Sequence, residues 1–238
     1  MKRIDQLSVK IFADGADLAG MLDLYRQPHI KGFTTNPTLM RRAGISDYRG
    51  FAKQVLAAIP DRPISFEVFS DEFPEMERQA REIASWGANV YVKIPVTNTR
   101  GVSACEIVRR LSHAGVKLNV TALLSLAQGR DVVGAVAGGA PSCISVFAGR
   151  VADTGYDPVP LMTAAVEMLR VAPGAELIWA SPRELLNIFQ ADAIGCHIIT
   201  VTHDILTKLS TVGRSLEDYS LDTVKMFHTD ATQAGFVL

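Results

Sequence analysis

The sequence predicts an α/β protein, a single closed (β/α)₈ barrel with an additional C-terminal helix, and three observations lead to this prediction. Short runs of β-branched and aliphatic residues alternate along the chain with longer amphipathic stretches, as in parallel strands joined by right-handed helical crossovers. Eight strand candidates fit into 238 residues, a length that suits eight such units in one barrel. The alternative is an open doubly wound sheet, but no GxGxxG or GxxxxGK[ST] motif follows a strand candidate.

The strand candidates are rich in β-branched and aliphatic residues, which favour strands. In order, they are residues 9–14, 32–36, 64–69, 90–96, 118–122, 143–148, 177–180 and 198–202. Helical stretches lie between them, at residues 16–26, 46–58, 74–86, 104–114, 126–137, 159–171 and 183–193. Most begin at a residue typical of a helix N-terminus, namely Asp17, Ser46, Pro74, Ser103, Ser125, Asp157 and Pro182. Glycine or proline ends many of them, at Gly87, Gly115, Gly138, Pro173 and Gly195.

The last helical stretch, residues 215–235, lies beyond the eighth strand candidate. Its apolar residues recur at roughly helical spacing and form a stripe, made of Leu216, Tyr219, Leu221, Val224 and Phe227, with Phe236 just beyond. The stripe covers either its own barrel or a neighbouring subunit, and we expect the neighbour. No Pro/Ser-rich linker, charge block or low-complexity tract divides the chain, so we expect one domain over residues 1–238.

Composition excludes several classes of partner. Apolar residues make up 48% of the chain and the net charge is −1, so charge gives no reason to expect binding to nucleic acid or to an anionic membrane. No apolar run approaches the roughly 20 residues that span a bilayer, and the first residues lack the apolar segment of a signal peptide. Neither the three cysteines nor the five histidines have metal-site spacing. We therefore expect a cytoplasmic protein without a bound metal.

Polar side chains stand at the end of nearly every strand candidate. They are Asp14, Asn36, Glu67, Lys93, Asn119 with Thr121, Ser145 with Arg150, and Ser181 with Arg183. In a (β/α)₈ barrel the active site lies at the C-terminal ends of the strands, so these groups converge on one volume. Taken singly, four of them have simpler explanations: caps for Asp14 and Ser181, strand propensity for Thr121 and an exposed helix surface for Arg183.

Lys93 is the exception, because it lies in the apolar run from Tyr91 to Val96. A lysine with only a structural role would need a buried carboxylate partner, and Asp14 or Glu67 can supply one. The functional interpretation is a Schiff-base nucleophile. Burial lowers a lysine pKa from about 10.4 toward neutrality, which leaves a free amine that attacks carbonyl groups. Glu67 and Asp14 would then move protons.

Arg150 and Arg183, with Ser145 and Ser181, predict a second function at the barrel rim. They follow the sixth and seventh strand candidates, close to where such barrels often hold phosphate. Guanidinium groups with hydroxyl donors suit an oxyanion. From these residues alone, a phosphate, a carboxylate and a sulfonate remain equally possible.

Five segments carry a resemblance to a known family. They read FTTNPT (33–38), VKIPVT (92–97), LNVT (118–121), SVFAGR (145–150) and ASPR (180–183). Together and in this order, they resemble the transaldolases, most closely the short ones grouped with fructose-6-phosphate aldolase. The resemblance implies sugar phosphate substrates, a Schiff-base mechanism without metal or cofactor, and homo-oligomers (pentamers or decamers) in which the terminal helix packs on a neighbour.

The resemblance also implies roles for the matching residues. Lys93 would form the Schiff base, Asp14 would take the proton of the C4 hydroxyl, and Glu67 with Thr121 would hold the water that moves protons. Asn36 and Asn119 would bind the dihydroxyacetone part of the substrate. The phosphate would be held by Ser145, Arg150, Ser181 and Arg183.

Two positions distinguish transfer from cleavage within the family. Glu67 and Phe147 match the transaldolases, whereas the aldolases carry glutamine and tyrosine there. We therefore expect a transaldolase, with two alternatives: an aldolase that uses the same lysine, and a barrel that only binds phosphosugars. The sequence departs from the family pattern at residues 13–17, at Val146 and at Pro182. These departures leave the chemistry intact and leave the substrate's tail open, with a specialised sugar, such as a sulfosugar or a precursor of a secreted polysaccharide, as the alternative to an ordinary sugar phosphate.

Overall fold

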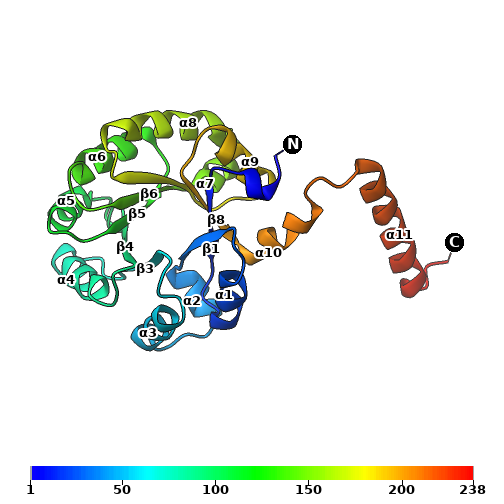
Figure 1. Ribbon diagram of the computed structural model, residues 1–238, viewed down its shortest axis with the longest axis horizontal. Helices are drawn as coiled ribbons and strands as arrows, with labels where there is room; N and C mark the ends of the chain where they lie inside the picture. The colour runs from blue at the N-terminus through cyan, green and yellow to red at the C-terminus, as the bar shows by residue number, and fades with distance from the viewer. Residues whose placement is uncertain (1, 238) are drawn as a thin grey trace.

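The chain, described here by a computed structural model over residues 2–237, folds into a closed barrel of parallel strands (Figure 1). Each strand pairs with the next, and β8 closes the ring by pairing with β1. The strands are β1 (Lys10–Asp14), β2 (Ile30–Thr34), β3 (Ile64–Glu67), β4 (Val90–Pro95), β5 (Leu118–Leu123), β6 (Ser142–Val146), β7 (Ala175–Trp179) and β8 (Ile198–Thr202). The predicted (β/α)₈ barrel is confirmed.

The long helices form the outer ring (Figure 1). They are α1 (Leu18–Tyr25), α3 (Tyr48–Ala58), α4 (Phe73–Ala84), α5 (Cys105–His113), α6 (Leu126–Val136), α8 (Pro158–Met168) and α9 (Leu186–Ala193). Three short helices, which the sequence did not predict, lie near the ends of strands: α2 (Pro37–Arg42), α7 (Ala148–Asp153) and α10 (His203–Leu206). Short 3₁₀ segments occur at Ile4–Gln6, Leu169–Val171 and Thr207–Thr211.

Two of the short helices shift boundaries that the sequence predicted. The second strand ends at Thr34, and Asn36 caps α2 by accepting a hydrogen bond from the Leu39 amide (2.9 Å). The sixth strand ends at Val146, because α7 begins at Ala148. Both predicted strands therefore ended two residues too late, one at the N-cap of α2 and the other at the first residue of α7.

The predicted helix starts are partly correct. Asp17, Ser125 and Asp157 are N-caps whose side chains accept backbone hydrogen bonds. The predicted helix starts at Ser46 and Ser103 are wrong, since Asp47 caps α3 and Ala104 precedes α5. Pro182 is also wrong: α9 begins only at Leu186, so Arg183 lies in the loop after β7.

The core has two parts. The larger part lies between the strands and the helical ring, and the smaller one lines the barrel interior with Phe12, Cys143, Ile178, Ala180 and Ile198. Strand side chains alternate between the two faces, so Phe12 shares the inner face with Asp14, and Ile198 shares it with Thr200. A Cβ on Gly32 would lie 2.5 Å from the Phe12 ring, so glycine leaves room for that ring. The inner apolar layer forms a floor beneath the polar strand ends.

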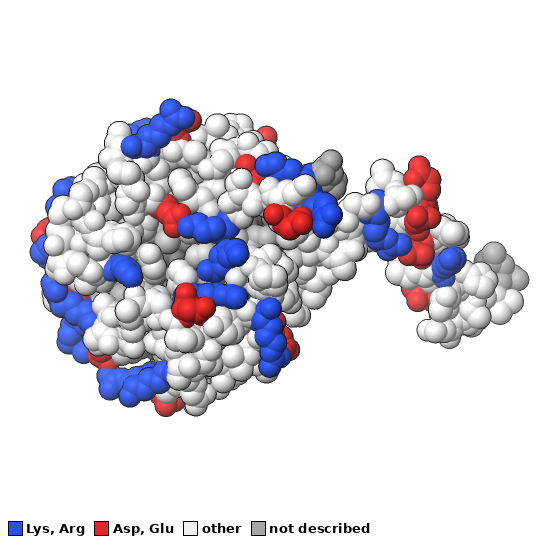
Figure 2. All heavy atoms as spheres, viewed as in Figure 1, with Lys and Arg blue, Asp and Glu red and all other residues white. Residues whose placement is uncertain are grey.

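Helix α11 (Leu216–Ala234) stands away from the barrel at the end of an extended connection (Figure 1). It begins at the N-cap Ser215 and ends at Gly235, which has a φ of 66°. None of its residues is buried. Side chains of both charge signs are interspersed along it and over the visible face of the barrel (Figure 2). None of the helices within residues 2–237 combines the length and hydropathy that a bilayer crossing requires.

Candidate active site

A cavity of about 720 Å³ opens at the C-terminal ends of the strands. Every predicted site residue except Asn119 lines it. The lining includes Asp14, Asn36, Glu67, Lys93, Thr121, Ser145, Phe147, Arg150, Ser181 and Arg183. The structure thus brings together groups from β1, β3, β4, β5 and β6 and from the loops after β2, β6 and β7. Within residues 2–237, no cluster of three or more His, Cys, Asp or Glu side chains is placed to hold a metal ion.

Strand register places three of the predicted residues in one row. Glu67 on β3 pairs with Lys93 on β4, and Lys93 pairs with Asn119 on β5. Residues paired across neighbouring strands project their side chains to the same face. The three side chains of the row therefore point to the same face, the barrel interior.

Lys93 is 6% exposed and faces the cavity rather than a closed core. Its ammonium Nζ lies 3.2 Å from Glu67 Oε2 and donates a hydrogen bond to the Thr35 carbonyl (2.9 Å). A lysine with only a structural role would also have such a carboxylate partner. A purely structural ion pair does not require a cavity beside it, yet Lys93 and Glu67 both line one.

Asp14 lies across the cavity and is held by two neighbours. Thr34 Oγ1 donates to Asp14 Oδ1 (2.7 Å), and Asn36 Nδ2 lies 3.5 Å from Oδ2. Burial raises the pKa of Asp14 above its ordinary value, although the charge of Lys93 and the Thr34 hydrogen bond lower it in part. A carboxyl group with a raised pKa is suited to exchanging protons with a bound substrate.

The raised pKa of Asp14 predicts a change in stability. Since the folded-state pKa lies above the unfolded one, the ionised carboxylate costs stability at pH 7, and this cost vanishes as the pH falls below the unfolded pKa of about 3.9. We expect Asp14→Asn to raise the free energy of unfolding at pH 7 by about 1 kcal/mol and to have little effect near pH 4. Urea unfolding at both pH values measures this difference.

Asp17→Asn is the matched control, because asparagine caps a helix as well as aspartate does. It should leave stability unchanged at either pH. A loss of stability in Asp14→Asn at pH 7 would contradict the account of Asp14.

Asn119 lies beneath the cavity instead of lining it. It is fully buried; its Nδ2 donates to Ser65 Oγ (3.0 Å), and its Oδ1 accepts from Ser145 Oγ (2.7 Å). Both ends of the amide are therefore engaged by side chains of β3 and β6. This network orients the Ser145 hydroxyl at the cavity floor.

Thr121 lines the cavity beside an irregularity in β5. The pairing of β5 with β6 shifts between Val120 and Leu123, and Ala122 has a φ of 66°. Such a bulge redirects side chains near functional sites. The Thr121 hydroxyl is buried and has no hydrogen-bond partner within residues 2–237. It is thus free to bind a molecule in the cavity.

The rim at β6 and β7 is cationic. Arg183 makes two hydrogen bonds to Asp153, one of 2.8 Å from Nε, and its Nη1 donates to Ser181 Oγ (3.1 Å). The Arg150 guanidinium lies over the Phe147 ring, 5.6 Å from its centroid. Arg183 is therefore a fixed group of the rim rather than an exposed helix residue.

Several lining residues were missed from the sequence. They are Thr34, Arg42, Thr200, Thr202 and Asp204. Thr200 and Thr202 follow Ile198 with the period of two that marks one face of a strand, and this pattern was a usable signal. Arg42 lies on the unpredicted helix α2, and no comparable pattern pointed to it.

The sequence has clear relatives among known proteins. A sequence model described as transaldolase/fructose-6-phosphate aldolase matches residues 11–237. The chain belongs to the transaldolase/fructose-6-phosphate aldolase family. A probable transaldolase of Dehalococcoides mccartyi is 36% identical over 202 residues, which cover 84% of this chain and 90% of the relative. One of Streptococcus agalactiae serotype V is 36% identical over 216 residues, covering 90% and 95%.

Membership of the transaldolase/fructose-6-phosphate aldolase family confirms the resemblance carried by the five segments and supports an aldolase-type function. Solved structures of lower similarity share only the barrel. One of 3-hexulose-6-phosphate synthase has a TM-score of 0.57 at 15% identity, covering 82% of this chain and 90% of that one. A putative lyase/mutase from Burkholderia cenocepacia has a TM-score of 0.59 at 14% identity, covering 97% and 86%.

Proposed function

We propose that the protein transfers a dihydroxyacetone unit from a ketose phosphate to an aldose acceptor through a Schiff base on Lys93. The observation that carries the proposal is the position of the Lys93 amine: it faces a cavity lined by polar groups, 3.2 Å from Glu67. Family membership and relatives named probable transaldolases support the same reaction type.

In the proposed reaction, the free amine of Lys93 attacks the C2 carbonyl of the donor and forms a carbinolamine, which loses water to give an imine. Glu67 accepts and returns the protons of these steps, with a water held by the Thr121 hydroxyl. Asp14 then takes the proton of the C4 hydroxyl as the C3–C4 bond breaks. The electron pair of that bond moves into the protonated imine and forms an enamine, and an aldehyde leaves. The enamine carbon then attacks the acceptor aldehyde, and water hydrolyses the resulting imine, which frees the product and the Lys93 amine.

The remaining roles are those that the family resemblance implies, and the positions of the residues support them. Arg150, Ser181 and Arg183 bind the phosphate of donor and acceptor at the rim, where Asp153 keeps the Arg183 guanidinium oriented. Ser145 lines the cavity floor near that rim, and Asn119 orients the Ser145 hydroxyl from below. Asn36 lies beside Asp14 and binds the dihydroxyacetone part.

Phe147 decides between transfer and cleavage in this proposal. An apolar ring lets the enamine persist until an aldehyde arrives, whereas a phenol would protonate it and release free dihydroxyacetone. We expect Phe147→Tyr to raise dihydroxyacetone release from fructose 6-phosphate, without acceptor, by at least about tenfold. A coupled enzymatic assay of free dihydroxyacetone measures it.

Phe69→Tyr, on an exposed loop residue outside the cavity, is the control and should behave as the wild type. If the wild type itself releases dihydroxyacetone as fast as it transfers it, the alternative function, an aldolase on the same lysine, is correct instead.

We also propose that α11 joins subunits into a homo-oligomer. Its apolar residues Leu216, Val224 and Phe227 are exposed, and the helix does not cover its own barrel. Such an exposed apolar stripe marks an interface. We expect the full chain to sediment as an oligomer and a chain ending at residue 214 to sediment as a smaller species. If the shortened chain still sediments as an oligomer with the same number of subunits as the full chain, α11 does not join the subunits.

A further inference from the structure

The backbone of Glu67 lies where two neighbouring strands separate. β2 pairs with β3 at Ile64 and Ser65, and the Thr35 amide still donates to the Ser65 carbonyl (3.1 Å). After that point the chain turns into α2, so the strand on that side offers no partner to Glu67. An amide and a carbonyl left without partners next to the cavity would cost stability and leave the strand end loose.

Tyr48, at the start of α3, fills this gap with its hydroxyl. The hydroxyl accepts a hydrogen bond from the Glu67 amide (2.7 Å) and donates one to the Glu67 carbonyl (2.8 Å). Burial raises the pKa of Tyr48 above its ordinary value, so the hydroxyl keeps the proton that it donates. The Tyr48 ring is fixed by aromatic contacts to Phe66, Phe69 and Trp86, with ring centroids 6.3, 5.4 and 5.8 Å away.

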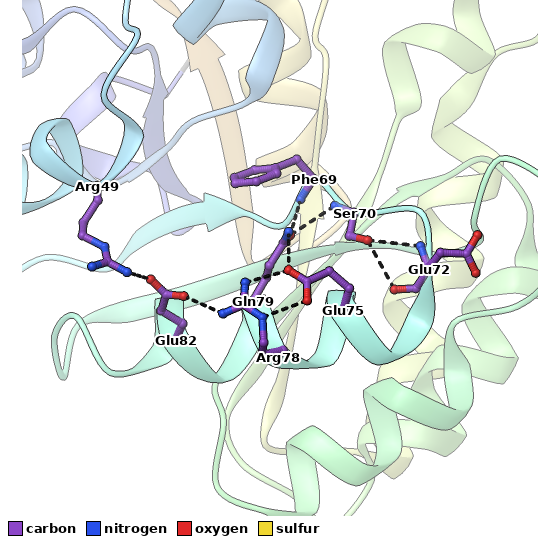
Figure 3. Close-up of polar contacts among 8 residues, drawn as sticks. All are labelled: Arg49, Phe69, Ser70, Glu72, Glu75, Arg78, Gln79 and Glu82. Carbon is purple, nitrogen blue, oxygen red and sulfur yellow. Dashed lines mark hydrogen bonds and ion pairs between the residues drawn. The ribbon is translucent and has the colours of Figure 1, made fainter.

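The chain after Glu67 is held from a second helix (Figure 3). Gln79 on α4 accepts hydrogen bonds from the amides of Phe69 (3.0 Å) and Ser70 (3.1 Å) through its Oε1. Its Nε2 donates to Glu75 (3.3 Å), which Arg78 also binds. β4 still holds one side of this segment, since the Val68 amide donates to the Lys93 carbonyl (3.0 Å). On the side away from β4, the segment from Glu67 to Ser70 is fixed at both ends by side chains.

We propose that Tyr48 is a positioning residue for Glu67. The Tyr48 hydroxyl takes the place of the missing strand and keeps the Glu67 carboxylate beside the Lys93 amine. The inference rests on the proposed function, in which Glu67 transfers protons to and from groups on that amine. Displacement of such a group by about 1 Å costs up to about a hundredfold in rate. Tyr48 does not line the cavity, so it acts on the rate and not on substrate binding.

The first test is Tyr48→Phe. Active sites are counted by borohydride trapping with fructose 6-phosphate, and turnover is expressed per trapped site, so that unfolded chains are not counted. We expect kcat to fall about tenfold and KM to stay within about twofold. Tyr25→Phe is the matched control, because within residues 2–237 the Tyr25 hydroxyl bonds only to Asp61, at the surface (2.6 Å). The control should keep the wild-type kcat.

The second test repeats Tyr48→Phe in a Glu67→Gln background. If Tyr48 acts through Glu67, the loss of the hydroxyl should then change kcat less than twofold. An equal fall in both backgrounds, or an unchanged kcat in Tyr48→Phe, would overturn the inference. The proposed function is tested separately: it fails if the wild type forms no trapped adduct on Lys93, or if the wild type releases dihydroxyacetone as fast as it transfers it.

Discussion

Replacing Lys93 with alanine is expected to abolish turnover while the barrel stays folded. The amine supplies the only bond between enzyme and substrate in the proposed reaction, so kcat should fall at least about 1,000-fold. The variant leaves Glu67 without the ammonium that now lies 3.2 Å away, which we expect to cost roughly 2 kcal/mol of stability. Steady-state transfer between fructose 6-phosphate and an aldose phosphate measures the first effect, and urea unfolding measures the second.

The double variant Lys93→Ala with Glu67→Gln separates the two effects. It removes both charges, so it should recover most of the lost stability and none of the activity. Activity in either variant above one tenth of the wild-type kcat would contradict a covalent role for Lys93.

Replacing Gly149 with alanine is expected to disrupt the phosphate rim. A Cβ at Gly149 would lie 1.6 Å from the Ser181 carbonyl oxygen and 2.8 Å from its carbon, and backbone atoms cannot yield as a flexible side chain can. Either α7, which carries Arg150, or the loop with Ser181 and Arg183 must move. We expect a loss of about 1–3 kcal/mol in stability and a rise of at least about tenfold in KM for phosphorylated substrates.

Gly134→Ala is the matched control for Gly149→Ala. Gly134 lies in α6, where a Cβ would meet no atom within 4 Å. The same substitution there should stabilise the protein by about 0.5–1 kcal/mol and leave KM unchanged. A Gly149→Ala enzyme with wild-type KM would show that the rim does not hold the phosphate.

The barrel was predictable because its signal is local and repeated. Each strand is a short run that is buried on both faces, and a helix with ordinary start signals follows it. The predicted third strand, residues 64–69, was two residues too long, since β3 ends at Glu67. Two further errors lie where a short helix begins directly after a strand, at Asn36 and Ala148. There the residues favour both states, and the helix is fixed by contacts that sequence spacing does not reveal.

The site was predictable to the extent that its residues stand at strand ends. Asp14 and Glu67 are the last residues of β1 and β3, and Lys93 lies near the end of β4. Their convergence follows from the barrel itself. Tyr48 and Gly149 were not found, because each acts on a backbone group distant in sequence, at Glu67 and Ser181. Asn119 was found, but its place beneath the cavity depends on partners in β3 and β6.

Borohydride reduction of the protein with fructose 6-phosphate, followed by peptide mass mapping, tests the central claim most directly. An imine is reduced to a stable secondary amine, so the modified peptide identifies the nucleophile. The account predicts one adduct per chain, on Lys93, and none in Lys93→Ala. An active enzyme that yields no adduct, or an adduct on another lysine, would contradict it.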